Sequence, residues 1–129
     1  MIYLDSSVAL AHLLSEDRHP DDALWQRPLV SSRLLEFEVW KRINAYGLAE
    51  SHGPLVQDLV ERVGIVELNR ETTARICAPF PSPLRTLDAL HLSAALYLDG
   101  MGFSVEIATY DEQMRAGAVS LELQLHALD

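Results

Sequence analysis

The chain opens with a short apolar run that gives way to polar residues and then to a longer apolar segment. Met1 to Leu4 includes isoleucine and tyrosine and fits a buried β-strand. Asp5 ends this run, and the two serines that follow it favour the start of a helix. Apolar residues then continue to Leu14. The opening pattern therefore predicts a strand, a carboxylate and a helix in direct succession.

Apolar spacing, turn residues and prolines divide the rest of the chain into further helices and strands. One apolar stripe predicts a helix over 33–47, and its members are Leu35, Val39, Ile43 and Tyr46. Other helices are predicted at 54–63 with Pro54 in the first turn, at 70–77 after an Asn69 cap, at 86–98 behind Thr86 as cap, and at 112–117 ending at Gly117. Strands are predicted at 29–32, 65–68, 103–110 and 121–125.

This succession of elements predicts a three-layer α/β/α domain with a mainly parallel central sheet. The chain has 129 residues, the length of one domain, and we assign 1–129 to a single domain. Leucines alternate with polar residues over 121–125, which predicts a half-exposed strand at an edge of the sheet.

Charge and cysteine content narrow the class of protein. The formal net charge is −9, which argues against a broad electrostatic grip on nucleic acid. The same excess fits either carboxylates gathered around a cation or simple solubility. The single cysteine, Cys77, excludes an intramolecular disulfide and fits a reducing compartment. No apolar stretch approaches the roughly 18 residues of a membrane span, and no signal segment is visible, so we expect a cytoplasmic protein without membrane contact.

Two aspartates follow predicted strands directly. Asp5 follows the first strand, and Asp111 follows the strand at 103–110. If both strands are parallel, these carboxylates stand at the same edge of the sheet, where open α/β folds bind ligands. The alternative for Asp5 is that it only caps the first helix.

Two further acids lie on predicted helices. Asp88 is in the first turn of an apolar and therefore buried helix, where it needs a partner or a metal unless it merely complements the helix dipole. Glu38 has an alternative role as an exposed i,i+4 ion pair with Arg42. His91, one turn beyond Asp88, fits a core histidine with one hydrogen bond.

The remaining chemistry is limited by what the sequence lacks. There is no glycine-rich phosphate loop, no Cys/His zinc spacing and no Gly-x-Ser-x-Gly elbow. A carboxylate cluster that binds a hard cation is the class that remains.

The chain resembles PIN domains, and among them the VapC toxins of bacterial type II toxin–antitoxin pairs. The resemblance rests on four segments in order, 1–7, 30–39, 86–95 and 108–114. It implies four catalytic and metal-binding acids, which fall on Asp5, Glu38, Asp88 and Asp111. Glu36 stands two residues before Glu38 and stays open as an alternative to it. Ser6 and Thr109 match family positions that support the acids.

The resemblance implies an endoribonuclease that uses Mg²⁺ or Mn²⁺, a homodimer, and inhibition by a cognate antitoxin protein. A single site in a tRNA or an rRNA is the kind of RNA substrate that the family cleaves. The resemblance places the C-terminal segment of the antitoxin in a groove near the acids. Candidates to line this groove are Trp25, Phe37 and Trp40, with ordinary core packing as their alternative. Candidate phosphate contacts, with solvated surface charge as their alternative, are Arg33, Lys41, Arg42, Arg85 and Arg115. The alternative is a PIN-like module that binds RNA or protein without cleaving it. A receiver or an aspartate-nucleophile phosphatase fits poorly, because Ser7 stands where such a phosphatase has its second acid.

Overall fold

A five-stranded sheet forms the centre of the computed structural model, which describes residues 1–128. The strands are β1 (Ile2–Leu4), β2 (Leu29–Ser32), β3 (Gly64–Val66), β4 (Glu106–Ala108) and β5 (Gln124–Leu125). They lie in the order β3-β2-β1-β4-β5, and every pairing is parallel. The sheet prediction is confirmed, and β5 is at an edge as expected.

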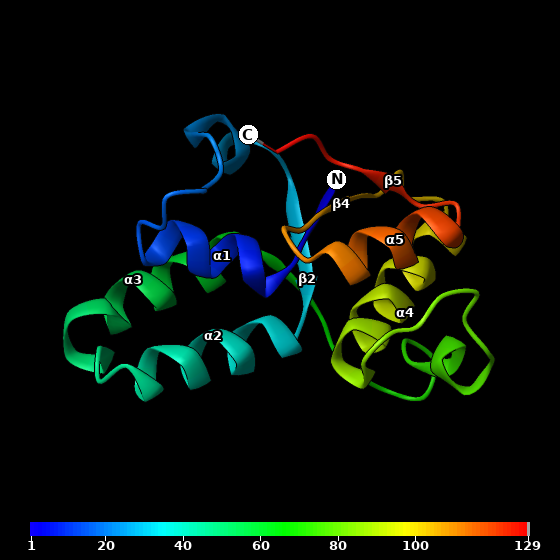
Figure 1. Cartoon of the computed structure of the whole chain (residues 1–129), viewed down its shortest axis with the longest axis horizontal. Helices are drawn as coiled ribbons and strands as arrows, with labels where there is room; N and C mark the ends of the chain where they lie inside the picture. The colour runs from blue at the N-terminus through cyan, green and yellow to red at the C-terminus, as the bar shows by residue number, and fades with distance from the viewer. Residues whose placement is uncertain (129) are drawn as a thin grey trace.

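Helices cover both faces of this sheet (Figure 1). On one side lie α1 (Ser6–Leu13), α2 (Leu34–Ala45) and α3 (Ala49–Arg62), and on the other lie α4 (Thr86–Gly100) and α5 (Glu112–Ser120). Two short 3₁₀ helices, η1 (Asp22–Gln26) and η2 (Ala74–Cys77), lie in the connections. The arrangement is the three-layer α/β/α fold that the sequence predicts.

The side chains on the two faces of β1 belong to two separate hydrophobic cores. Ile2 and Leu4 pack with the side chains of α1, α2 and α3, whereas Tyr3 packs with those of α4 and α5. All three are completely buried. Successive side chains of a strand point to opposite faces, so a strand covered by helices on both sides is apolar throughout. This is why the first run of the chain contains no polar residue before Asp5.

The strand order places a crevice at the carboxyl ends of β1 and β4. The chain leaves β1 toward β2 on one side and later returns to β4 on the other, which makes β1/β4 the switch point of the sheet. The backbone N–H of Asp5 donates to the carbonyl of Ala108 at 3.0 Å and closes the two strands together there. The residues that follow β1 and those that follow β4 therefore begin side by side at the carboxyl edge of the sheet.

The predicted helix at 54–63 begins earlier than expected. It starts at Ala49, so Pro54 lies inside α3 rather than in its first turn. Pro54 is exposed there, and it has no N–H to donate to the preceding turn of the helix. The buried stripe is correspondingly shifted. Leu59 is buried as predicted, but Leu55 is 51% exposed.

The predicted helix at 70–77 is wrong except for the turn η2. Asn69 does act as a cap, because its Oδ1 accepts from the N–H groups of Glu71 and Thr72 at 2.9 and 3.0 Å. The hydroxyls of Thr72 and Thr73 then donate to backbone carbonyls of Glu67 and Asn69. Such side-chain bonds compete with helical ones, so the segment stays a series of turns.

The last strands and helix differ from prediction in their lengths. The strand predicted at 103–110 is confined to β4, and that at 121–125 to β5. Gly117 does not end its helix, since α5 continues to Ser120. A Cβ atom at position 117 would lie 2.8 Å from Cδ2 of Leu84, so this glycine lets the proline-rich connection approach α5. No helix in residues 1–128 has the length and apolar character to cross a membrane.

The shifted stripe of α3 can be tested with two matched leucine substitutions. Leu59→Ala should lower the free energy of unfolding by about 2–5 kcal/mol, because it leaves a cavity in the core. Leu55→Ala, one turn earlier in the same helix, should cost less than about 1 kcal/mol, because the side chain is half exposed. Urea unfolding measures both. Equal losses would mean that the helix has the register predicted from the sequence.

Candidate active site

The four predicted acids line one cavity of about 610 Å³. Asp5 comes from the end of β1, Glu38 from α2, Asp88 from α4 and Asp111 from the start of α5. The cavity therefore lies at the carboxyl edge of the sheet, where the parallel strands bring these segments together. Ser6 also lines it.

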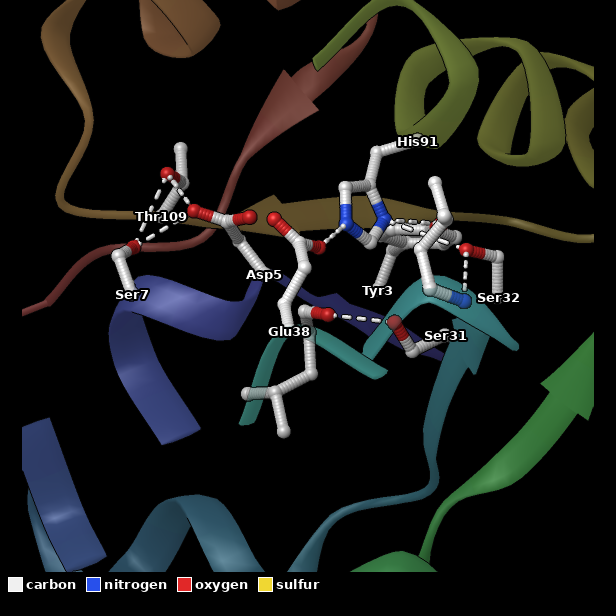
Figure 2. A network of polar contacts seen from close by, with 10 residues as sticks. Tyr3, Asp5, Ser7, Ser31, Ser32, Glu38, His91 and Thr109 are labelled. Carbon is white, nitrogen blue, oxygen red and sulfur yellow. Dashed lines mark hydrogen bonds and ion pairs between the residues drawn. The ribbon is translucent and has the colours of Figure 1, made fainter. Parts of the chain in front are cut away.

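Asp5 is 4% exposed, and its carboxylate does not cap α1. Its Oδ2 instead accepts from the Ser7 hydroxyl at 2.6 Å and from the Thr109 hydroxyl at 2.7 Å (Figure 2). Thr109 is completely buried at the end of β4. The alternative role of Asp5 as a simple helix cap is thus wrong, and the carboxylate joins β1 to the neighbouring strand.

Ser7 is a site residue that the sequence reasoning missed in favour of its neighbour Ser6. Besides contacting Asp5, the Ser7 oxygen accepts from the backbone N–H of Tyr110 at 3.0 Å. The signal in the sequence was a pair of serines after the strand, which does not tell the two hydroxyls apart. Only the first turn of α1 sets which of them faces β4.

Asp111 combines a cap with a place in the cavity. Its Oδ1 accepts from the Met114 N–H at 2.8 Å, which caps α5, and its own N–H donates to the Thr109 hydroxyl at 3.0 Å. Thr109 therefore contacts Asp5 through one bond and Asp111 through another. The position predicted for a supporting residue carries these two contacts.

The two glutamates of α2 point to different partners. Glu36 pairs with Arg33 at 3.1 Å, outside the cavity, and Arg33 also pairs with Glu67. Glu38 lines the cavity and lies 2.6 Å from Nε2 of His91, rather than pairing with Arg42. Glu38 is therefore the α2 acid that shares the cavity with the other three predicted acids.

His91 is completely buried and has more contacts than the single hydrogen bond expected of it. Its Nδ1 lies 2.8 Å from the Tyr3 hydroxyl and 3.4 Å from that of Ser32, while Nε2 faces Glu38. Burial opposes a charge on this ring, but the hydrogen bond to Glu38 and the nearby carboxylates outweigh burial and raise the pKa of His91.

The carboxylates act on one another electrostatically. The pKa of Asp88 is raised to about 6, first by burial and then by the negative charges of Asp111 and Asp5. Acidic side chains also outnumber arginines in the lining of this cavity, so its negative charge is not balanced by its own basic residues.

Comparison with known proteins identifies the family. Residues 2–119 match the PIN domain family. The chain belongs to this family. It is also 28% identical to the Ribonuclease VapC35 proteins of two strains of Mycobacterium tuberculosis, over alignments that cover 98% of this chain and 96% of each relative. The resemblance drawn from the four sequence segments is therefore confirmed.

The donor set of this PIN domain fits a hard divalent cation. In the part of the chain that the structure describes, no three histidine, cysteine or acidic side chains form a ready-made metal cage. Mg²⁺ does not need one, since it is usually held through one or two carboxylates together with water and substrate phosphate. The cavity offers carboxylate oxygens from the four predicted acids and from Glu16 in the loop after α1, and the raised pKa of Asp88 marks excess negative charge that a cation would relieve.

The predicted basic and aromatic contacts are only partly at the site. Arg42 and Arg85 line the cavity, and so does Arg18, which sequence reasoning missed because it lies in a polar loop. The Arg18 guanidinium lies 4.6 Å from the centre of the Tyr110 ring. Trp25 stacks on His12 away from the acids.

The pH dependence of stability tests the charge on Asp88. Its pKa is about 6 in the folded protein against an ordinary 3.8, so the folded state holds the proton more tightly and loses stability as the pH rises from about 4 to about 6. In metal-free protein, Asp88→Asn should therefore be more stable than the unsubstituted chain above pH 6, with no gain near pH 4. Thermal unfolding across this range measures the difference. Asp99→Asn, at the exposed far end of α4, is the control, and a gain of constant size would contradict the assignment.

The contacts of Ser7 can be tested against those of Ser6. Ser7→Ala removes a donor to a buried carboxylate and leaves the Tyr110 N–H without its acceptor, so the free energy of unfolding should fall by about 1–3 kcal/mol. Ser6→Ala removes none of these bonds and should cost less than about 0.5 kcal/mol. Denaturant unfolding without metal compares the two. A larger loss for Ser6→Ala would show that the first turn of α1 is rotated.

Proposed function

We propose that this PIN domain is a metal-dependent endoribonuclease, the toxin of a toxin–antitoxin pair. One observation carries the proposal. Four acids from four separate segments line a single cavity at the carboxyl edge of the sheet. The name of its relative, Ribonuclease VapC35, supports RNA as the substrate.

Asp5, Glu38, Asp88 and Asp111 would hold Mg²⁺ or Mn²⁺. A bound divalent cation supplies Lewis-acid chemistry, because it polarises a phosphoryl oxygen and lowers the pKa of water. The chain's own part is to keep the acids in place. The hydroxyls of Ser7 and Thr109 hold Asp5, and the backbone N–H of Met114 holds Asp111. Ser6 lies beside them on the cavity wall.

Arginines at the same cavity supply the positive charge that an RNA backbone requires. Arg18, Arg42 and Arg85 line it together with the acids. A guanidinium binds phosphate oxygens in a two-point geometry, which also orients the phosphodiester. The overall charge of −9 does not attract RNA, so we assign the attraction to these local contacts.

The same proposal extends to partners and location. We infer an RNA target such as a tRNA or an rRNA, a cognate antitoxin and a homodimer, on the similarity to VapC proteins. Exposed apolar side chains of Phe37 and Tyr46 on the α2 side offer surface for protein contacts. A cytoplasmic location is supported by the single cysteine, Cys77, which suits a reducing compartment.

A second candidate is a PIN module that binds RNA or protein without cleaving it. The net charge of −9 favours it, because a strongly acidic protein does not attract RNA overall. The convergence of four acids on one cavity favours the nuclease, because a binding module gains nothing from their mutual repulsion.

Cleavage of total cellular RNA by the purified protein tests the proposal. We expect discrete fragments with Mg²⁺ or Mn²⁺ and none with EDTA. Glu38→Gln should reduce the rate on the order of 100-fold or more, because it removes a charge from the cavity while keeping the shape of the side chain. Glu36→Gln is the matched control on the same helix and should stay within about threefold of the unsubstituted rate, since Glu36 pairs with Arg33 outside the cavity.

Two outcomes would overturn this assignment. A folded protein free of antitoxin that leaves RNA intact with both metals would favour the binding module. Cleavage that depends on Glu36 as much as on Glu38 would mean that α2 presents a different face to the cavity.

A further inference from the structure

We propose that His91 is a positioning residue that holds Glu38 toward the metal site, and that Tyr3 fixes the ring of His91 in the form that does so. The inference rests on the proposed function and adds to it a residue outside the four acids. His91 itself does not line the cavity and acts through Glu38.

The contacts form a chain across three elements. The Tyr3 hydroxyl of β1 lies 2.8 Å from Nδ1 of His91 on α4, and Nε2 of the same ring lies 2.6 Å from the carboxylate of Glu38 on α2. Tyr3 and His91 are completely buried, whereas the Glu38 side chain is 23% exposed. The chain of contacts thus leads from the core to the rim of the cavity (Figure 2).

The protons on this chain follow from its two ends. An ionised carboxylate only accepts hydrogen bonds, so Nε2 must carry a hydrogen at 2.6 Å from Glu38. A tyrosine hydroxyl is both a donor and an acceptor, and the Tyr3 hydroxyl lies 2.8 Å from Nδ1, so it can donate to that nitrogen. In the neutral ring, that donation disfavours the tautomer with hydrogen on Nδ1, which is the one form with a bare Nε2 toward Glu38. In the protonated ring both nitrogens carry hydrogen, so Nε2 donates to Glu38 in that form too.

The consequence is a fixed place for a long and otherwise flexible side chain. The Glu38 side chain loses rotamer entropy when it is fixed in one position. The hydrogen bond to His91 offsets this loss before any ligand binds. One Glu38 oxygen is occupied by the ring, and Figure 2 draws the carboxylate between His91 and Asp5. Asp88 lies one turn before His91 on α4, so the same contact also sets the spacing between the acids of α2 and α4.

Two substitutions of His91 separate positioning from simple core filling. His91→Gln keeps an N–H donor near the place of Nε2, whereas His91→Asn keeps a polar atom only near Nδ1, facing Tyr3. Outer partners of metal ligands typically contribute about 10–100-fold in metal affinity or activity. We therefore expect His91→Asn to lower both Mn²⁺ affinity and kcat by that factor, with His91→Gln within about threefold of the unsubstituted protein.

A double-mutant cycle shows whether His91 acts through Glu38. In a Glu38→Ala background there is no carboxylate to position, so adding His91→Asn should change Mn²⁺ affinity by less than about twofold. Calorimetric titration with Mn²⁺ gives the affinities without reference to cleavage, and thermal unfolding checks that each variant is folded. The Tyr3→Phe variant, which keeps the buried ring, should show part of the His91→Asn loss.

The ring can also be observed directly in the metal-free protein. Nitrogen-15 NMR of the imidazole should show hydrogen on Nε2 in the unsubstituted chain. A bare Nε2 would overturn the proposal, and so would equal losses in His91→Gln and His91→Asn or an undiminished loss in the Glu38→Ala background. Failure of the unsubstituted protein to bind Mn²⁺ and cleave RNA would instead overturn the proposed nuclease, which the NMR result distinguishes.

Discussion

The buried carboxylate of Asp5 is the feature on which the site depends. A charge this well buried is costly unless it is hydrogen-bonded, and it receives two hydroxyls, from Ser7 and Thr109. These bonds join the start of α1 to the end of β4 across the switch point of the sheet. The stabilisation of one ion thus fixes the geometry of the edge at which Asp111 and α5 begin.

The remaining acids bring like charges together at that edge, at some expense of stability. Burial raises the pKa of Asp88, and the negative charges of Asp111 and Asp5 raise it further. A fold selected for stability alone would separate such charges or pair them with bases. The arginines of the cavity line it without forming ion pairs with the four acids in the described chain, so the repulsion is left for a cation to relieve.

Three of the four predicted acids in the cavity follow from simple rules. Asp5 and Asp111 end strands of a parallel sheet, and Asp88 lies on an apolar helix, so topology alone brings them together. Glu38 needed the family resemblance, since its helix offers Arg42 as an equally good partner. Ser7, Arg18 and the contacts of His91 were not predictable, because they depend on side-chain direction within a turn, a loop or the core. The turns at 70–73 were missed for a similar reason, since threonine hydroxyls there replace helical hydrogen bonds.

His91 shows how the layers of the fold and the site are connected. Glu38 lies on a helix that covers one face of the sheet, and His91 lies on a helix that covers the other. Tyr3 belongs to the central strand, and its hydroxyl lies within hydrogen-bond distance of the His91 ring. The contact therefore spans all three layers at the point where the sheet ends. Because a hydrogen bond weakens steeply with misalignment, the distance between the two helix layers is constrained by the same bond that orients an acid. At this edge of the sheet, the packing of the helix layers and the position of the Glu38 carboxylate therefore depend on the same contact.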